Sequence, residues 1–575
     1  MTSRPTATLT RAQELARPAD VALDPTELGS ARYTRHSFAR SCLRAAVAQN
    51  WKVDCSHWEL DAEGRGTAVF RIAIAADTFH FVVFSTTVPE DQRTDRVIAT
   101  SWDVKAALVT GEVDDHRIDE LRRQVPLQER GRADDQTLIW TRANRSGRFF
   151  DYVVSRLAAG NQPEAEAMGD SAYVLRSTAF YSNGKFGLAD FERFAIDHPL
   201  RLPYRAHMLA AWLLREFSYR LVEHCAAERD PRAVPLRGGW RRFFGLGNAT
   251  GLGMVPYVVN HPQVLDAWCA ARELPLAHSL DQVVASDDPK VARVAELLDR
   301  ARVYFGERTE LATAPFLPCP EIAIQLDHLS HLIAEYRSTG TVLGDPVSYA
   351  WQALHDAAGE LGLECRGVLD SIIVEVHPEL DDGVDQLLRC DQTQAVQGGR
   401  TCAQLLAALQ HGYEWVREFD FTDPTQQSFF WYSSADNEEP RRGRRGQDSG
   451  EDVEHPIDIA RAVTRLWDDL IGCPPEHSVA EFLLGHPWHR GAVARVQAVS
   501  DHPYAECRTN LLAEDFLPLN IQRFQLAQYG MESYSPQSTD WLRVVLYSGA
   551  PRTDDVAAGI DDDWMFTCKP VKDTP

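Results

Sequence analysis

Four glycines fall within nine residues near the middle of this 575-residue chain: Gly245, Gly247, Gly251 and Gly253. They follow an aromatic and basic run that begins at Trp240, and they are separated by small or apolar residues. Glycine destabilises a helix interior because it loses the most backbone freedom on folding, and the segment is too apolar for a flexible linker. The sequence therefore predicts that the backbone here comes close to something, either a packed element or a ligand.

The rest of the chain has the composition of a globular protein, with 44% hydrophobic and 25% charged residues. Its length exceeds what one hydrophobic core usually supports, so several subdomains are expected. Helical and strand patterns both occur and helices dominate, which predicts a soluble, helix-rich fold of the α+β or mixed α/β class. The expected parts are a mobile arm over 1–30, an α/β subdomain with a β-hairpin over 31–164, a helix-rich central region with glycine-rich loops over 165–345, a mixed C-terminal region over 346–550 with a charged loop at 433–456, and an acidic tail over 551–575.

Several segments have patterns strong enough to predict single elements. Two apolar runs at 67–75 and 78–85 flank a short break and predict an antiparallel hairpin. Apolar residues at helical spacing predict a helix over 204–228. The β-branched run within 371–377 predicts a strand. The tail from Thr553 onward is expected to be loose.

Net charge, apolar runs and cysteine spacing limit the classes of partner and the cellular location that we expect for this chain. The formal net charge is −24, which repels phosphate and argues against nucleic acid or anionic lipid as a partner. No run of 18 apolar residues is present, and the first 20 residues lack the apolar core of a secretory signal. The eleven cysteines are dispersed without a Cys-x-x-Cys pair and are expected to be reduced thiols. We therefore expect a cytoplasmic protein with no membrane partner; its oligomeric state stays open, a homodimer included.

The glycine-rich segment is the first candidate binding site. Lys185 lies in a second short glycine-containing turn, 182–187, and could bring its ammonium group to a phosphate or carboxylate. Neither segment has the spacing of a Walker motif or of a dinucleotide-binding fingerprint. Close packing of a strand against a helix would explain the same glycines. The expected substrate-binding residues are Arg242, Gly245, Gly247, Asn248, Thr250, Gly251 and Gly253.

Lys185, His207 and Glu216 are the candidate catalytic residues. His207 and Glu216 both lie on the strong helix, but nine residues apart, so they face opposite sides and cannot act together. No Gly-x-Ser-x-Gly elbow is present, which argues against a serine hydrolase. The leading hypothesis is an enzyme that acts on a small carboxylate or phosphate, with its reaction class undetermined. A non-catalytic assembly or regulatory protein fits the same length and composition.

A second candidate site would hold a divalent metal, the one cofactor that the sequence suggests. Asp327, His331 and Glu335 are spaced i, i+4 and i+8 on a predicted helix, with His328 adjoining them. Imidazole and carboxylate suit Zn²⁺, Fe²⁺ or Mn²⁺, which suggests a metal-dependent oxygenase or hydrolase as the alternative function. A solvated polar helix face would show the same residues. Histidines that precede proline, such as His486, are interpreted as turn residues.

Overall fold

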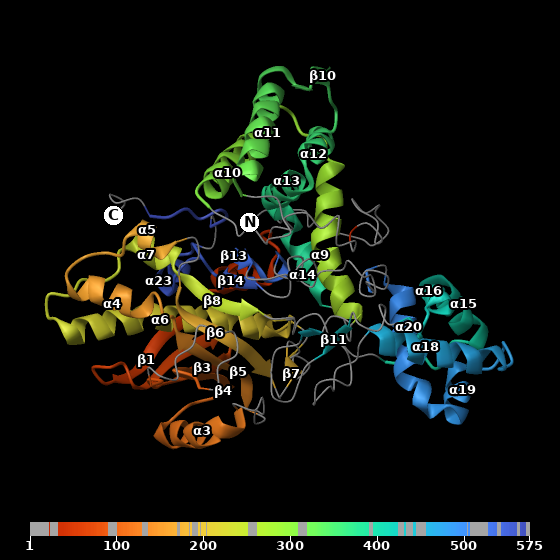
Figure 1. Cartoon of the computed structure of the whole chain (residues 1–575), viewed down its shortest axis with the longest axis horizontal. Coiled ribbons are helices and arrows are strands. Elements are labelled where there is room, and N and C mark those ends of the chain that lie inside the picture. Colours follow the sequence, from red (N-terminus) through yellow and green to blue (C-terminus); the bar gives the residue numbers. More distant parts are fainter. Residues whose placement is uncertain are drawn as a thin grey trace. The chain divides into compact units, whose positions relative to one another are not determined.

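The computed structural model describes residues 22, 33–89, 101–128, 136–169, 173–182, 185–186, 194–195, 197–202, 204–250, 262–308, 319–389, 395–423, 430–432, 441–443, 456–502, 504–505, 527–536, 542–560 and 564–570. Two compact units divide the chain, and each is assembled from separate segments (Figure 1). Unit 1 comprises 1–30, 251–282 and 377–525, and unit 2 comprises 31–250, 283–376 and 526–575. The parts expected from the sequence are contiguous, whereas these units are not. The predicted helix-rich, mixed α/β class is confirmed.

A ten-stranded sheet forms the centre of unit 2. Its strands, from one edge to the other, are β1 (Lys52–Leu60), β2 (Gly66–Ile74), β3 (Asp77–Ser85), β4 (Val104–Thr110), β5 (Thr137–Arg145), β6 (Tyr173–Ser182), β8 (Gly245–Thr250), β14 (Leu542–Leu546) and β13 (Met531–Pro536), and the short β7 (Lys185–Phe186) pairs with β6. Every recorded pairing is antiparallel except that of β6 with β8. The predicted hairpin is confirmed as β2 and β3, which pair from Gly66–Ser85 to Ile74–Asp77.

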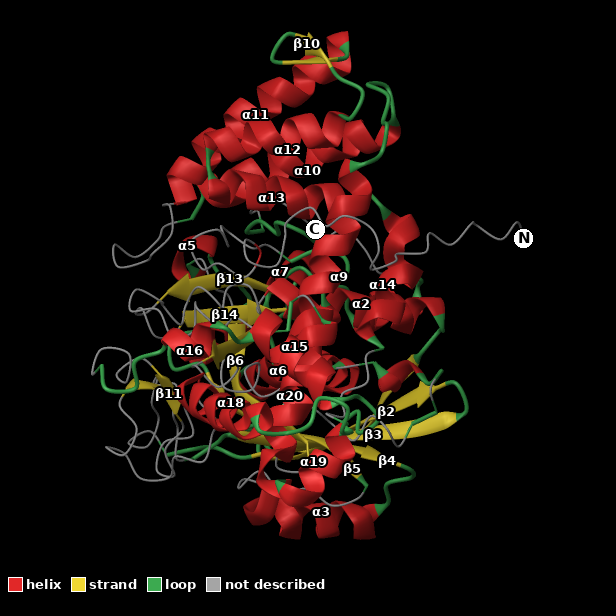
Figure 2. Cartoon of the chain, turned by 90° about the vertical axis from the view of Figure 1, so that its right-hand side faces the viewer, coloured by secondary structure: helices red, strands yellow, loops and turns green. Residues whose placement is uncertain are grey.

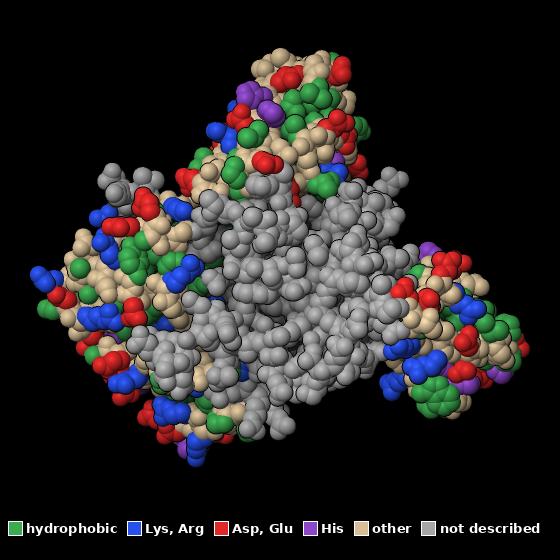
Figure 3. Space-filling view, in the orientation of Figure 1, with side chains coloured by type: hydrophobic (Ala, Val, Ile, Leu, Met, Phe, Trp, Pro, Cys, Tyr) green, Lys and Arg blue, Asp and Glu red, His purple; other side chains and the backbone are tan. Residues whose placement is uncertain are grey.

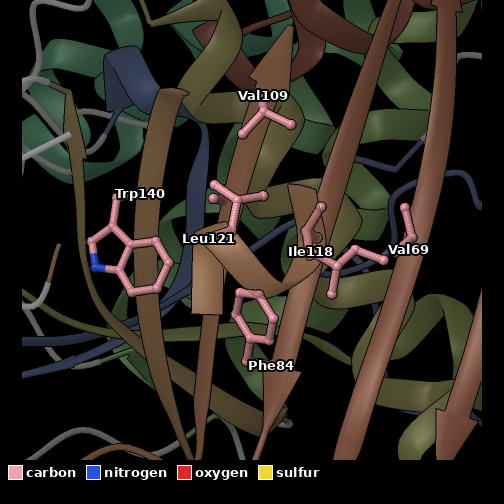
Figure 4. Packing of buried hydrophobic residues seen from close by; sticks show 8 residues of the cluster. Val69, Phe84, Val109, Ile118, Leu121 and Trp140 are labelled. Carbon is pink, nitrogen blue, oxygen red and sulfur yellow. The ribbon is translucent and has the colours of Figure 1, made fainter. Parts of the chain in front are cut away.

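Helices cover both faces of this sheet (Figure 2). On one face, Ile118 and Leu121 of α3 (Asp115–Gln128) pack against Phe84 and Trp140 from the strands (Figure 4). On the other face, α6 (Arg205–Arg229) contacts β4, β5, β6 and β8. Most of its side chains are buried, including several on each side, as expected for a helix enclosed by other elements. The flanking helices on this side are α2 (Phe38–Ala48), α4 (Phe150–Ala158) and α7 (Gly238–Phe243).

The glycine-rich segment forms β8, an inner strand of the sheet. Its neighbours are β6, 70 or so residues earlier, and β14, almost 300 residues later. A Cβ atom on Gly245 would lie 2.6 Å from the carbonyl oxygen of Leu546, and one on Gly247 would lie 2.6 Å from the ring of Tyr173. These two glycines are therefore required by close packing inside the protein.

Four long helices complete unit 2: α10 (Pro289–Gly306), α11 (Cys319–Thr339), α12 (Ala350–Leu361) and α13 (Leu363–Glu375). The strand predicted at 371–377 is wrong, because residues 371–375 form the last part of α13. Ile372 and Ile373 are fully buried there, so the gain from packing against neighbouring helices exceeds their modest preference for strands. Glu375 forms an ion pair with the buried Arg40 of α2, 2.5 Å away, which links these helices to the rest of unit 2.

The C-terminal segment is folded against unit 2 in the described ranges, contrary to the loose tail expected from Thr553. Trp564, Met565 and Phe566 are buried, and the backbone carbonyl of Trp564 accepts a hydrogen bond from the Tyr33 hydroxyl at 3.3 Å. The preceding helix α23 (Thr553–Ala557) contacts α2. Acidic composition misled the prediction because the aromatic residues of the segment supply enough apolar surface to hold it in place.

Unit 1 is helical in its described residues, apart from one hairpin of three-residue strands. Its helices are α9 (Pro262–Leu280), α14 (Asp381–Leu388), α15 (Cys402–Gly412), α16 (Trp415–Glu418), α18 (Pro456–Ile471), α19 (Val479–Gly485) and α20 (Arg490–Asp501), and the hairpin pairs β11 (Phe430–Tyr432) with β12 (Arg441–Gly443). Capping boxes begin α15 at Thr401 and α19 at Ser478, where side-chain oxygens satisfy free helix amides. Most of the expected arm over 1–30 and of the charged loop over 433–456 lies outside the described residues.

None of the described helices combines the length and the hydropathy that a membrane span requires.

The packing around β8 predicts a sharp difference between two glycine substitutions. Gly245→Ala should lower the free energy of unfolding by about 1–3 kcal/mol, because the new methyl group would collide with backbone. Gly238→Ala is the matched control, since a Cβ there meets nothing within 4 Å. Urea unfolding followed by circular dichroism measures both variants. Equal stability of Gly245→Ala and the wild type would contradict the packing described.

A buried ion pair between α12 and α13 makes unit 2 sensitive to pH. Burial by itself lowers the pKa of His355, but the Asp370 carboxylate, whose Oδ1 is 2.6 Å from Nδ1, outweighs it and raises the pKa above 6.5. The folded state therefore binds this proton more tightly, so its stabilisation is complete below pH 6.5 and is lost as pH rises through the raised pKa. We expect the loss of stability in Asp370→Asn to be largest below pH 6.5 and to shrink as pH rises through the raised pKa of His355. A constant difference between the variant and the wild type would contradict this.

Candidate functional site

A cavity of about 260 Å³ opens beside α6 in unit 2. Glu216, Tyr219, Arg220 and Glu223 line it from one face of the helix, because residues three, four and seven apart share a side. Arg241 from α7 lines it too, and the remaining wall is the start of α23, Arg552 to Asp554. Glu216, a candidate catalytic residue of the sequence analysis, is thus placed in a pocket.

Arg215 holds the walls of this cavity together. Its guanidinium is fully buried and donates hydrogen bonds to five backbone carbonyls of the described residues: those of Phe244 at 2.9 Å, Arg242 at 3.1 Å, Arg241 at 3.2 Å, Ala550 at 3.0 Å and Pro551 at 3.3 Å. A planar guanidinium with five donors can reach several carbonyls at once. One side chain therefore ties α7 and the segment before α23 to α6.

Glu216 lies at the inner end of the cavity with an incomplete set of partners. Its side chain is 5% exposed, and its Oε2 accepts a hydrogen bond from the Thr553 hydroxyl at 3.3 Å. Its Oε1 has no hydrogen-bond partner among the described residues, and the nearest cation, Arg215 Nη1, is 3.9 Å away. Burial raises the pKa of Glu216, against the opposing effect of Arg215, Arg220 and Arg552. The carboxyl group therefore keeps its proton to a higher pH than an exposed glutamate.

Tyr219 presents a second buried polar atom to the same cavity. Burial raises the pKa of Tyr219 well above its usual value, and the nearby Glu216 adds to the effect. Its hydroxyl interacts with the Glu216 carboxyl group and has no other hydrogen-bond partner among the described residues. The two side chains therefore form a buried polar pair in the wall of the cavity. A hydroxyl and a carboxyl group can each make more than one hydrogen bond, so this pair can also bond to a water molecule or a ligand in the cavity.

Arg220 is the cation of the pocket that is left for a ligand. Arg241 is paired with Glu223, 2.6 Å away, and Arg552 lies 3.5 Å from Asp555. Arg220 is exposed and packs its guanidinium 5.7 Å from the centre of the Phe70 ring, and no carboxylate is paired with it in the described ranges.

Close packing inside the protein explains two of the glycines in the segment that was predicted to be a binding site. Gly245 and Gly247 approach other parts of unit 2, and the backbone of β8 is hydrogen-bonded within the sheet, so these residues do not present free amides to an anion. Asn248 and Thr250 belong to β8, opposite Val544 and Leu542 of β14. Gly251 and Gly253 lie outside the described residues. The backbone carbonyl oxygen of Arg242 accepts one hydrogen bond from the Arg215 guanidinium and one from the amide of Gly549.

The backbone of Lys185 lies on the same edge of β6 as β8. Tyr181 of β6 pairs with β5 on one side and with β7 on the other, which is the side that β8 occupies further back along the strand. Asn248 pairs with Ser177, so Thr250 stands about three residues, or about 10 Å, from the level of Lys185. The association of Lys185 with this segment stays a prediction.

His207 is placed in the core. Burial lowers the pKa of His207 to about 3, so its ring is neutral at ordinary pH. The ring lies 5.3 Å from that of Tyr204, and His207 is not among the residues that line the cavity by Glu216. This arrangement agrees with the expectation that His207 and Glu216 face different sides of the helix.

The predicted metal ligands share the surface of α11. His328 and His331 are exposed, and the Nδ1 of His331 lies 2.8 Å from the backbone oxygen of Asp327. The Glu335 carboxylate accepts hydrogen bonds from Gly344 and Thr341, which lower its pKa. Metal binding at these residues stays a prediction.

In unit 1, three described side chains bring atoms that could bind a metal ion close to one another. Asp469, His486 and His489 have one donor atom each within 4.8 Å of the others. This group was not predicted from the sequence, because Asp469 lies in a different helix, α18, from the two histidines and His486 has the pattern of a turn residue. The only local signal was the spacing of two histidines around Pro487 and Trp488.

The role of Arg215 can be tested by keeping its charge and changing its geometry. Arg215→Lys should lower the free energy of unfolding by about 2–5 kcal/mol, because a lysine cannot reach five carbonyls and leaves some of them unpaired. Arg229→Lys, in the exposed last turn of the same helix, should change it by less than about 0.5 kcal/mol. Chemical denaturation measures both, and matching stabilities would show that Arg215 does not hold the cavity walls.

No family model matches the chain, and neither a curated protein nor a solved structure matches it.

Proposed function

We propose that this protein is an enzyme that binds a small carboxylate or phosphate compound in the cavity beside α6, with Glu216 as its acid–base group. The observation that carries the proposal is a buried pair of polar groups, the Glu216 carboxyl and the Tyr219 hydroxyl, which lie close to each other in the wall of a cavity. Buried titratable groups with shifted pKa values in a cavity are typical of functional sites.

The size of the cavity favours a small substrate. Its volume of about 260 Å³ is just below the range of about 300–1,000 Å³ that is typical of ligand pockets. The cavity walls carry three arginines and three acidic residues. When Glu216 is protonated, the arginines exceed the ionised acids by one, and this balance suits a ligand with negative charge.

Each residue has a distinct role in this proposal. Arg220, at the exposed rim, attracts and holds the anionic group of the substrate. Glu216 donates its proton to the substrate, and the resulting carboxylate is stabilised by Arg215 and Arg552 nearby. Tyr219 donates a hydrogen bond to an oxygen on which negative charge develops. A location in the cytoplasm, which the sequence favours, is part of the same proposal.

Anion binding should depend on Arg220 and on pH. In wild-type protein, inorganic phosphate and citrate should bind more tightly as pH falls through the raised pKa of Glu216, because protonation removes a negative charge from the cavity. Arg220→Met should weaken binding at least about tenfold, since it removes a charge–charge contact of about 1.4 kcal/mol or more. Glu216→Gln should bind with no such pH dependence. Isothermal titration calorimetry at several pH values measures all three.

Arg232→Met is the control for charge alone. Arg232 is exposed and paired with Asp230 outside the cavity, so its loss should leave anion binding unchanged. If Arg220→Met bound phosphate and citrate as well as the wild type, the site would be wrong. Glu216→Gln also separates an enzyme from a binding protein: it should retain binding and lose turnover, whereas binding without turnover in the wild type would favour the regulatory alternative.

A further inference from the structure

We propose that Asp469, His486 and His489, called here the triad, bind a divalent transition-metal ion such as Zn²⁺, Co²⁺ or Fe²⁺. The triad lies in unit 1 and shares no residue with the cavity beside α6, so the two proposals are independent. It also differs from the set predicted on α11.

The local fold brings the triad together from two directions. Asp469 lies in the last turn of α18, while His486 precedes and His489 ends the short 3₁₀ turn η5 (Pro487–His489) between α19 and α20. Pro487 cannot continue α19, so the chain turns there. Residues three apart in a 3₁₀ turn lie above one another, which places His486 and His489 on the same side.

The distances within the triad suit ligands of one ion. Asp469 Oδ2 is 2.7 Å from His489 Nε2 and 3.6 Å from His486 Nδ1. Two atoms that are each about 2.1 Å from a tetrahedral Zn²⁺ are about 3.4 Å apart. Small rotations of the side chains would therefore place all three atoms around one ion.

Two nitrogen atoms in the triad have unsatisfactory hydrogen bonding without an ion. His486 Nδ1 is a buried atom with no hydrogen-bond partner among the described residues, and its ring is held by stacking on Phe482 at 4.7 Å. His489 Nε2 lies within hydrogen-bond distance of both Asp469 and the indole nitrogen of Trp488. The indole can only donate, so a neutral His489 cannot donate to Asp469 and accept from Trp488 with the same atom. A metal ion bound to Nε2 and to the carboxylate would replace the proton between them, and the Trp488 indole, which also hydrogen-bonds to the Asp469 carboxylate, would then donate to that carboxylate alone.

The donor set indicates the class of metal and an open site. Two imidazoles with one carboxylate suit first-row transition metals, whereas Mg²⁺ and Ca²⁺ prefer oxygen ligands alone. The Asp469 side chain is 41% exposed and His486 35%, so solvent reaches the triad. The surface of this part of unit 1 carries histidine and acidic side chains (Figure 3). Three protein ligands leave at least one coordination position for water or a substrate, as in catalytic metal sites.

The experiment uses the tag-free full chain after removal of metal with a chelator. Co²⁺ is titrated and followed by its visible absorption, and Zn²⁺ is titrated by calorimetry, with Mg²⁺ for comparison. We expect one Co²⁺ or Zn²⁺ per chain, a higher melting temperature with the ion, and no comparable effect of Mg²⁺. Asp469→Asn and His486→Gln should each weaken binding at least tenfold.

Two controls locate the ion. Asp468→Asn changes the neighbouring exposed carboxylate, which pairs with Arg417, and should bind like the wild type. The double variant Asp327→Asn, His331→Gln changes the α11 set and should also bind like the wild type. Circular dichroism of each metal-free variant shows whether it is folded. The proposal is overturned if the wild type takes up no stoichiometric Co²⁺ or Zn²⁺, if folded Asp469→Asn and His486→Gln bind as the wild type does, or if only the α11 variant loses the ion.

Discussion

The burial of one guanidinium organises the part of unit 2 that contains the cavity beside α6. Arg215 is fully enclosed, and it is neutralised by the partial charges of five carbonyl oxygens, with the nearest carboxylate, that of Glu216, beyond hydrogen-bond distance. A buried charge is costly unless it is surrounded by such partners, so the segments that supply the carbonyls are held to α6. The start of β8, the last turn of α7 and the approach to α23 all depend on this side chain. The positive charge of Arg215 also opposes the rise in the pKa of Glu216. The same residue therefore holds the cavity walls and affects a carboxyl group that lines them.

Local patterns in the sequence predicted the elements whose burial is simple. The hairpin of β2 and β3 was recognised from two apolar runs that flank a short break, and α6 from its apolar spacing. The pattern failed where packing decides the outcome: Ile372 and Ile373 favour a strand, yet they lie in a buried helix. The glycines of β8 were recognised as sites of close approach, but the partners, Tyr173 and Leu546, lie far away in the sequence. One sequence without homologues contains no information about such pairings.

The same limit explains what was predicted of the candidate sites. Glu216 could be proposed because it lies on the clearly predicted helix over 204–228 and a carboxylate can act as a general base. Thr553, which bonds to it, could not be, since it follows more than 300 residues later. His486 was interpreted as a turn residue, and it does lie at a turn. The same turn also brings its ring close to Asp469, which the local sequence did not indicate. Residues whose role arises from the meeting of distant segments are visible only in the folded chain.

The position of β14 has a consequence for synthesis of the protein on the ribosome. This strand supplies the neighbour of β8 on its free side, and it begins at Leu542, near the end of the sequence. While the preceding residues are being made, the unpaired edge of β8 remains available to any other extended chain. Unit 1, encoded largely between β8 and β14, emerges during this interval. Each new chain must therefore keep an inner strand of its main sheet unpaired until the intervening residues and β14 have been made, a period in which protection by a chaperone would be of greatest value.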